Sequence, residues 1–387
     1  MNDWREVTLT EVAAEVTVGH VGSMAQQYQE SGVPFLRSLN IAPHSLDLNQ
    51  VKFISDEFHS KLKKSALRPG DVVTVRTGKP GTTSVIPKDL PVANCSDLVI
   101  TRPGPSLNAQ WFSYYMNSIA SNYIDSHLVG AVQQHFNVGS AKSLKLLLPP
   151  LAQQQAIAEV LGTLDDKIAA NTRLAENADS FINLQFQATI KRSVPTPKPF
   201  FEVFNVEYGE AFKGDNFVEP GIGRPLIRIR DLKTFFSQVW TTESRSKEVI
   251  VNAGDIVVGM DAEFRATSWL GEPGLLNQRV CRVTSNLGQS AFVRESLRQP
   301  LATIENYKTG TTVIHLNKKD LAQSTVLLPD REAIKFFDST TESLYRSRVA
   351  LASENRILAT TRDALLPQLM SGELHVKDAE ALVESVV

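Results

Sequence analysis

Residues 148–192 read LPPLAQQQAIAEVLGTLDDKIAANTRLAENADSFINLQFQATIKR. Pro149 and Pro150 can occupy the first turn of a helix, and no further proline follows before Pro195. Apolar or small side chains recur at alternating intervals of four and three residues, which is the spacing of a seam between two long helices. The packing positions predicted from this seam are Ile157, Leu161, Leu164, Ile168 and Ile182. Asn171 falls on the same seam, where a polar residue usually fixes the register.

A second stretch of the same kind begins at Arg331. Its large apolar residues recur every seven positions, at Phe337, Leu344, Leu351, Leu358 and Leu365. Each predicted helix spans roughly 55 Å at about 1.5 Å per residue. Either stretch alone could be an ordinary core helix. Two long stretches with matching seams instead favour a pair of helices that pack along each other in the manner of a coiled coil.

The regions between these helices are predicted to be mixed domains of short strands and helices. In the first region the β-like runs are 33–39, 71–76, 97–101 and 144–148, with one helical patch at 109–123. In the second region the β-like runs are 226–229, 255–260, 278–283 and 324–328, with helical patches at 291–297 and 301–307.

The two halves also match each other in sequence. Residues 130–137 (GAVQQHFN) align with 310–317 (GTTVIHLN) at an offset of 180, and 69–73 (PGDVV) align with 253–257 (AGDIV) at an offset of 184. Offsets that change at loops and hold within elements indicate a diverged internal duplication. The predicted fold class is therefore α+β, with two pseudo-repeated mixed α/β domains separated by two long antiparallel coiled-coil helices. The predicted segments are domain 1 (1–148), the first long helix (149–198), domain 2 (199–329), the second long helix (330–375) and a C-terminal tail (376–387).

Composition is that of a soluble globular protein. The chain has 387 residues, of which 42% are hydrophobic and 21% charged, and its formal net charge is −2. No apolar run approaches the length of a membrane span, and the first residues do not read as a signal peptide, so a cytoplasmic protein is expected. Cys95 and Cys281 cannot by themselves make a disulfide framework or a zinc site, and we expect both in strand cores.

Catalytic motifs are not recognisable. Gly78-Lys79-Pro80 lacks the upstream glycine and the following Ser/Thr of a phosphate-binding loop. The pattern Asp255…Glu263-Phe-Arg265 resembles a nuclease metal site but ends in arginine rather than lysine. The chain is therefore predicted to be no enzyme on its own and to hold no metal.

Two matching loops are candidates for binding nucleic acid. Residues 76–83 follow a predicted strand and offer Arg76, Thr77, Lys79 and Thr82, and the counterpart at 261–268 offers Arg265 and Thr267. Short hydroxyls and cations can contact phosphates, and Arg or Lys can reach guanine O6 and N7. A solvated hairpin tip is the alternative for each loop.

A second pair of loops and three further arginines complete the candidates. The loops offer Gln133, Gln134, His135, Thr311, Thr312 and His315. Glutamine can pair with adenine, and threonine can meet a base or the thymine methyl group. The two histidines recur in register, so a structural role for them is equally open. The arginines that follow early strands are Arg37, Arg228 and Arg230, which are either phosphate contacts or partners in buried ion pairs.

These motifs resemble a known family. LPPLAQQ at 148–154, followed by LDDKI at 164–168 and Asn171, is similar to the signature that opens each long helix of type I restriction–modification specificity subunits. LLPQLMSGELHV at 365–376 resembles the end of such a helix. Two departures stand out. Gln153 occupies a position that is usually Glu, and the second copy begins LPDRE at 328–332 without the proline pair.

The resemblance implies a function and a set of partners. Each globular half would be a target recognition domain that reads one half of a bipartite site in double-stranded DNA, and the helices would set the length of the unread spacer. Two methyltransferase (modification) subunits carrying S-adenosylmethionine would dock on the chain, and restriction/translocase subunits using ATP and Mg²⁺ would join them. No cofactor is expected in this chain. The alternative is a coiled-coil protein-interaction scaffold without DNA recognition.

Overall fold

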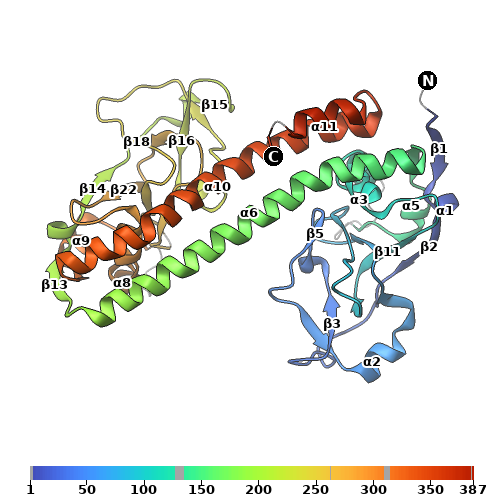
Figure 1. The fold of residues 1–387 in the computed structure, drawn as a ribbon, viewed down its shortest axis with the longest axis horizontal. Coiled ribbons are helices and arrows are strands. Elements are labelled where there is room, and N and C mark those ends of the chain that lie inside the picture. The colour runs from blue at the N-terminus through green and yellow to red at the C-terminus, as the bar shows by residue number, and fades with distance from the viewer. Residues whose placement is uncertain (1–2, 127–134, 262, 309–313, 385) are drawn as a thin grey trace. The chain divides into compact units, whose positions relative to one another are not determined.

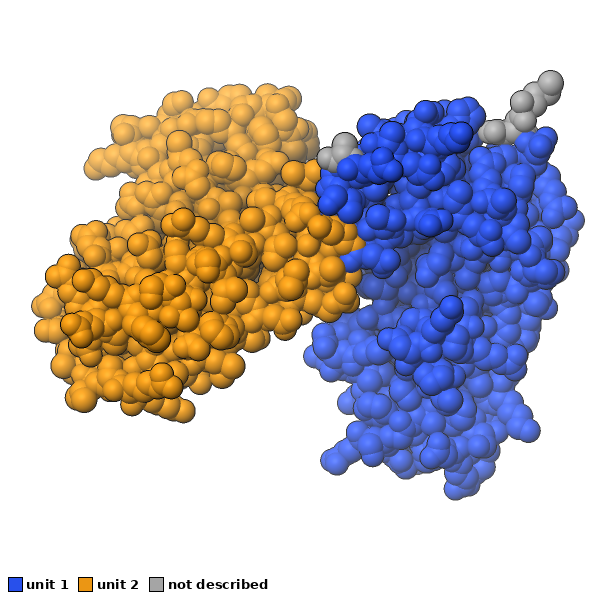
Figure 2. Space-filling model, viewed as in Figure 1, with its two compact units in different colours: residues 1–166, 358–387 blue, residues 167–357 orange. Residues whose placement is uncertain are grey.

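The computed structural model describes residues 3–126, 135–261, 263–308, 314–384 and 386–387. It divides into two compact units (Figure 2). Unit 1 comprises residues 1–166 and 358–387, and unit 2 comprises residues 167–357. Among the residues described, no helix is both long enough and apolar enough to cross a membrane.

Two helices of 42 and 41 residues, α6 (Leu151–Arg192) and α10 (Arg331–Ser371), confirm the predicted long helices and contribute to both units (Figure 1). Within unit 2, Lys167 forms an ion pair with Glu354, at 3.2 Å, and Asp179 forms one with Arg348, at 2.7 Å. From Lys167 to Asp179 along α6, the ion-pair partner on α10 moves back from Glu354 to Arg348. These parts of the two helices therefore run antiparallel.

The two long helices begin with different local chemistry. In the first turn of α6, the buried Gln154 side chain donates to the Pro149 carbonyl, at 2.8 Å, and accepts from the Asn108 backbone amide, at 2.8 Å. Before α10, the Asp330 carboxylate accepts from the Ala333 amide at 2.8 Å. Asp330 thus caps the helix through a side-chain oxygen, which explains how the second copy starts its helix without a proline pair.

Most of the predicted seam is buried. The fully buried positions are Ile157, Leu161, Leu164, Ile182, Phe337, Leu358 and Leu365, whereas Ile168, Leu344 and Leu351 are half-buried. Asn171 is buried on the seam, and Asn355 of α10 donates to the Thr172 hydroxyl at 3.2 Å. The middle of the helix pair is therefore more polar than its ends.

Unit 1 contains the first mixed domain. Its strands are β1 (Arg5–Thr8), β2 (Ala13–Val18), β3 (Val33–Leu36), β4 (Ile41–Ala42), β5 (Ser45–Leu46), β6 (Lys52–Ile54), β7 (Ala66–Leu67), β8 (Val72–Val75), β9 (Thr83–Val85), β10 (Ala93–Cys95), β11 (Leu98–Pro103) and β12 (Lys145–Leu148). Its helical elements are α1 (Leu9–Val12), η1 (Ser38–Asn40), α2 (Asp56–Lys61), η2 (Lys63–Ser65), α3 (Ala109–Asn117), α4 (Ser121–Ser126), α5 (Val138–Lys142) and, after α10, α11 (Val376–Glu384).

Unit 2 contains the second mixed domain. Its strands are β13 (Thr196–Pro199), β14 (Asn205–Tyr208), β15 (Phe217–Val218), β16 (Arg224–Ile227), β17 (Trp240–Thr241), β18 (Ile250–Val251), β19 (Ile256–Gly259), β20 (Ala266–Ser268), β21 (Gly274–Leu276), β22 (Val280–Thr284) and β23 (Thr325–Leu328). Its helical elements are α7 (Phe200–Val203), η3 (Gly214–Asn216), η4 (Ile229–Lys233), α8 (Ser290–Lys308) and α9 (Lys318–Gln323).

The two domains share one topology. Sheet β2-β11-β8-β9 of unit 1 corresponds to β14-β22-β19-β20 of unit 2, and the two-stranded pair β1–β12 corresponds to β13–β23. In each unit one parallel strand pair, β3–β10 or β16–β21, lies in the second large sheet and is flanked by an antiparallel neighbour, β7 or β18. This shared order confirms the internal duplication.

An ion-pair motif also recurs in both copies. Arg102 of β11 pairs with Glu15 of β2 and lies 3.6 Å from Asp71. In unit 2, Arg282 of β22 pairs with Glu207, at 2.7 Å, and with Asp255, at 3.3 Å. The aspartate in each copy also accepts a 2.9 Å hydrogen bond from the backbone amide three residues earlier. Asp255 is thus part of the domain framework, as Asp71 is in the first copy.

Two helix predictions need correction. The patch predicted at 109–123 is broken into α3 and α4, because the backbone leaves the helical conformation at Ser118, where φ is −129° and ψ is −86°. At this end of α3 the Asn117 side chain bonds the backbone of Thr83, at 3.0 and 2.8 Å. The two patches predicted at 291–297 and 301–307 form the single helix α8, with Pro300 inside it. Buried Leu297 and Leu301 on either side of the proline hold the helix together by packing. The predicted tail contains the helix α11.

Candidate nucleic-acid interface

In unit 1, the β8–β9 turn and η1 form one surface. They line a hollow of about 340 Å³, to which Ser38 and Leu39 contribute from η1 and Gly78 and Lys79 from the turn. The Leu39 side chain is 78% exposed, and Lys79 is also exposed. An exposed leucine beside an exposed cation is suited to the mixed apolar and phosphate surface of a DNA groove.

Arg76 and Thr77 lie at the root of this turn and point inward. The Arg76 guanidinium forms an ion pair with Asp97, at 2.9 Å, and its Nε donates to the Phe136 carbonyl at 3.3 Å. The Thr77 hydroxyl donates to the other Asp97 oxygen at 2.6 Å, and Thr82 donates to the Lys79 carbonyl at 3.0 Å. These side chains shape the turn, and Lys79 is the candidate that it presents to solvent.

The early-strand arginines have three different surroundings. Arg228 forms an ion pair with the fully buried Asp231, at 3.1 Å, so it stabilises η4. Arg37 donates to the Gln50 carbonyl at 3.0 Å, and its guanidinium lies 5.9 Å from the centre of the Tyr28 ring. Arg230, by contrast, is exposed on η4.

Unit 2 carries a polar cluster where unit 1 carries the Arg76 pair. His315 Nδ1 lies 2.7 Å from the Asp261 carboxylate. Arg279 lies 3.2 Å from the same ring nitrogen, and its Nε lies 3.7 Å from Asp261. The Arg279 side chain is 52% exposed. This cluster therefore presents a guanidinium that a neighbouring carboxylate orients.

Sequence reasoning missed Arg279. Asp97 directly precedes β11, as Arg279 directly precedes β22. The register supports this equivalence, because Leu98 pairs with Val75 and Val280 pairs with Gly259. An alignment of the two copies on these strands places the basic residue Arg279 where the first copy has the acidic residue Asp97.

The remaining candidates are more dispersed. Arg265 is 76% exposed and lies 3.5 Å from Glu263. Thr267 is half-buried on β20, and His135 is half-buried beside Phe136, whose amide donates to the Arg76 carbonyl. Four further candidates, Gln133, Gln134, Thr311 and Thr312, lie outside the described residues.

Nothing in the described part of the chain assembles three or more His, Cys, Asp or Glu side chains into a metal site. Both cysteines are buried and free, and burial raises the pKa of Cys281 to about 12 and raises that of Cys95 as well. Thiols held in this way stay protonated at neutral pH and do not act as nucleophiles.

Residues 1–178 and 198–342 match the family model described as the type I restriction modification DNA specificity domain. The chain belongs to this family. Each matched region holds one mixed domain and the start of the long helix that follows it, so the family model covers both copies of the duplication.

Curated relatives carry the same family name. The chain is 30% identical over 190 residues to the type I restriction enzyme EcoBI specificity subunit of Escherichia coli, which covers 48% of this chain and 40% of that subunit. It is 27% identical over 164 residues to the type I restriction enzyme HindI specificity subunit of Haemophilus influenzae, an alignment that covers 39% of this chain and 35% of that subunit. The alignments thus span less than half the length of these relatives.

A solved structure shares the fold. The type I restriction-modification system S subunit from M. genitalium superposes with a TM-score of 0.64, over 95% of this chain and 96% of that chain, at 13% identity. This specificity-domain fold therefore persists at very low sequence identity.

Proposed function

We propose that this chain is the DNA specificity subunit of a type I restriction–modification complex and is itself non-catalytic. The observation that carries the proposal is the duplicated specificity domain, each copy joined to its own long helix. Each domain reads one half of a bipartite site in double-stranded DNA, and the antiparallel helix pair sets the spacer between the halves.

The two candidate surfaces differ in chemistry. Unit 1 presents Leu39 and Lys79, whereas unit 2 presents Arg230, Arg265 and Arg279. Arginine can bind guanine O6 and N7 together, whereas an aliphatic side chain suits the thymine methyl group and lysine suits a phosphate. Two unlike surfaces favour a site whose halves differ in sequence.

The partners and cofactors complete the proposal. Two methyltransferase subunits holding S-adenosylmethionine bind this chain, and restriction/translocase subunits supply the ATP- and Mg²⁺-dependent steps. The chain holds none of these cofactors and works in the cytoplasm, where its DNA target lies. The names of the curated relatives, which are specificity subunits of type I restriction enzymes, support this assignment.

Sequencing of methylated bases in the source genome, with and without this gene, tests the proposal. The expected result is loss of N6-methyladenine at one split motif of two short blocks around a fixed spacer. An unchanged methylome in a strain that expresses the whole complex would contradict it. Binding of a duplex by the assembled complex should also weaken steeply with salt. A protein scaffold would show no such binding.

A further inference from the structure

In unit 1, one carboxylate joins three helices. Asp165 of α6 accepts a 2.5 Å hydrogen bond from the Tyr114 hydroxyl of α3. Its other oxygen forms a 2.6 Å ion pair with Arg362 of α10. The recognition domain, through α3, and both long helices therefore meet at a single side chain.

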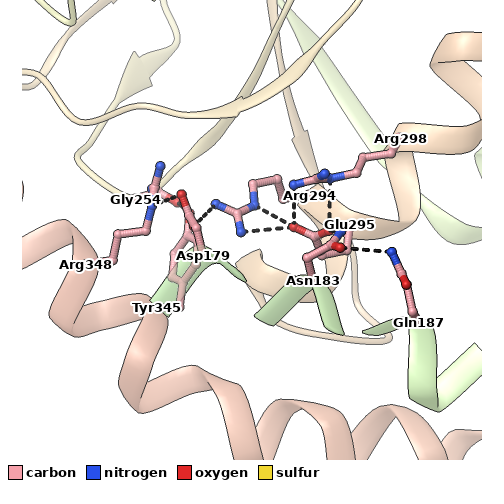
Figure 3. Close-up of polar contacts among 9 residues, drawn as sticks. All are labelled: Asp179, Asn183, Gln187, Gly254, Arg294, Glu295, Arg298, Tyr345 and Arg348. Atoms are coloured by element: carbon pink, nitrogen blue, oxygen red, sulfur yellow. Dashed lines mark hydrogen bonds and ion pairs between the residues drawn. The ribbon is translucent and has the colours of Figure 1, made fainter. Parts of the chain in front are cut away.

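In unit 2, another carboxylate does the same with different partners (Figure 3). Asp179 of α6 forms 2.7 Å ion pairs with Arg294 of α8 and with Arg348 of α10. Arg294 continues to Glu295 of its own helix, at 2.9 Å. Asn183 of α6 donates to the second Glu295 oxygen, also at 2.9 Å. Here too the domain helix, α6 and α10 share one acid.

In both arrangements an aspartate of α6 contacts a domain helix and α10, but the residue that the domain helix contributes differs. Both domain helices, α3 and α8, follow the last strand of the same four-stranded sheet, β11 or β22. The domain contributes a phenol in one copy and a guanidinium in the other. We call Asp165 with Tyr114 and Arg362 the first clamp, and Asp179 with Arg294 and Arg348 the second clamp.

The domain residue of each clamp is more buried than the aspartate that it contacts. Tyr114 is 3% exposed, whereas the side chains of Asp165 and Asp179 are 22% and 35% exposed. The side chains of Arg294 and Arg348 are 5% and 12% exposed, and Glu295 is fully buried. Burial opposes the charge of Arg294, but Asp179 and Glu295 outweigh it and raise the pKa of Arg294. Burial and the adjacent Asp165 also raise the pKa of Tyr114, so its phenol remains a neutral donor.

Apolar contacts between the same elements are less directional. Phe186 of α6 lies 6.2 Å from Phe292 of α8 and 5.6 Å from Phe337 of α10, centroid to centroid. Such rings can slide by a fraction of an ångström at little cost. A charge-assisted hydrogen bond weakens steeply when its length or angle changes. In the second clamp its loss also takes the carboxylate away from Arg348, whose side chain is only 12% exposed.

We propose that Asp165 and Asp179 are positioning residues that fix the orientation of each recognition domain on the helix pair, so that the complex accepts one spacer length. This inference rests on the proposed function. The clamp residues themselves contact no DNA base. They hold in place the domain that contacts the bases, so they determine which spacer length is accepted and not which sequence is read in either half-site.

The test uses the full complex and duplexes that carry its own split motif with the native spacer, one base pair fewer or one base pair more. Tyr114→Phe removes the hydroxyl from the first clamp but keeps the ring. Its matched control is Tyr115→Phe, because Tyr115 donates at 3.2 Å to the Lys145 carbonyl inside the domain. Asp179→Asn weakens the second clamp. Its control is Arg346→Gln, which breaks an exposed pair with Glu342 within α10.

The readout is the ratio of methylation rates on native and altered spacers. Tyr114→Phe and Asp179→Asn should each lower this ratio by about tenfold, the effect of losing one hydrogen bond to a charged group. Preference among half-site sequences should not change, and the two control variants should keep the native ratio. If Asp179→Asn does not fold, Arg348→Gln is the alternative variant, because it removes only the ion pair between α10 and Asp179.

A purely structural role predicts a different result. Rates on all spacers would then fall together, the ratio would stay native, and the positioning role would be wrong. If the unaltered complex showed no preference for any split motif, the proposed function itself would fail. The two failures are therefore distinguishable.

Discussion

The imidazole ring of His44 lies against the ring of Tyr114, with 4.2 Å between the ring centroids and 33° between their planes. His44 occupies the turn between β4 and β5, and Asn117 Nδ2 lies 3.3 Å from its Nδ1. An amide donor at Nδ1 suits a neutral ring that accepts there. The hairpin that follows η1 is thereby tied to the helix that carries the first clamp.

Stability should therefore depend on the protonation of His44. Burial lowers its pKa to about 4, against an ordinary value of 6.5. The folded state thus favours the neutral ring. Its contribution is fully present above pH 6.5 and is lost as the pH falls toward 4. Between pH 7 and pH 5, the loss amounts to about 2 kcal/mol by linkage. Urea unfolding at both pH values, on the chain and on His44→Gln, measures it. An equal pH slope in both proteins would contradict the assignment.

Asp338 of α10 should show the opposite pH dependence. Burial, with the nearby Glu342 adding to it, raises the pKa of Asp338 to about 6 from 3.8. The folded state therefore holds this proton more tightly than the unfolded state. That contribution is lost as the pH rises from 4 through 6. Asp338→Asn keeps an acceptor for the Gln289 amide and should raise the thermal midpoint at pH 8 but not at pH 4.5. A gain of the same size at both pH values would show that ionisation is not the cause.

The duplicated arginines allow a comparison within one chain. The glutamates paired with Arg102 and Arg282, Glu15 and Glu207, are 45% and 43% exposed. The aspartates differ, because Asp71 beside Arg102 is 6% exposed and Asp255 beside Arg282 is 27% exposed. Removing a partner from a buried charge costs about 3 kcal/mol, and from a partly solvated one about 1 kcal/mol. Arg102→Gln should therefore lower the free energy of unfolding of its unit more than Arg282→Gln does. Equal losses would mean that water reaches Asp71 as readily as Asp255.

Lys79 is expected to contact phosphate and not a base. Lys79→Ala should weaken duplex binding by a similar factor on every sequence and reduce the slope of log affinity against log salt by about 1. Lys61→Ala on α2 is the control, since Lys61 is also exposed and pairs with Glu57 within its own helix. A loss confined to one base position would instead identify Lys79 as a base-reading residue.

Helix length is expected to set the spacer. Deleting 168–174 from α6 and 353–359 from α10 removes one heptad from each helix and leaves both clamps in place. Seven residues are about 10 Å, or roughly three base pairs. The methylated motif should shorten accordingly. Binding should also weaken, because three base pairs turn the duplex by about 100°. An unchanged spacer would exclude the helix pair as the determinant of length.

Sequence periodicity was sufficient for the architecture, because heptads and repeat offsets are properties of the chain itself. The seam from Ile157 to Leu164 is buried as its spacing predicts. The site was harder to predict. Arg76 turns inward to form an ion pair with Asp97, which lies 21 residues later in the chain, and no sequence pattern predicts that contact. Asp165 and Asp179 flank the seam, where charged residues usually face solvent, so pattern alone could not separate a clamp from a solvated face.

The strand pairs β1–β12 and β13–β23 have a consequence for how such a protein can change. In each unit the chain enters and leaves the recognition domain side by side, on two antiparallel strands joined by backbone hydrogen bonds. Everything between them is an insert with adjacent ends. Genetic exchange at these two junctions could therefore replace one domain by a foreign one without altering the long helices. Under the proposed function, a domain exchanged in this way would bring its own half of the DNA target with it.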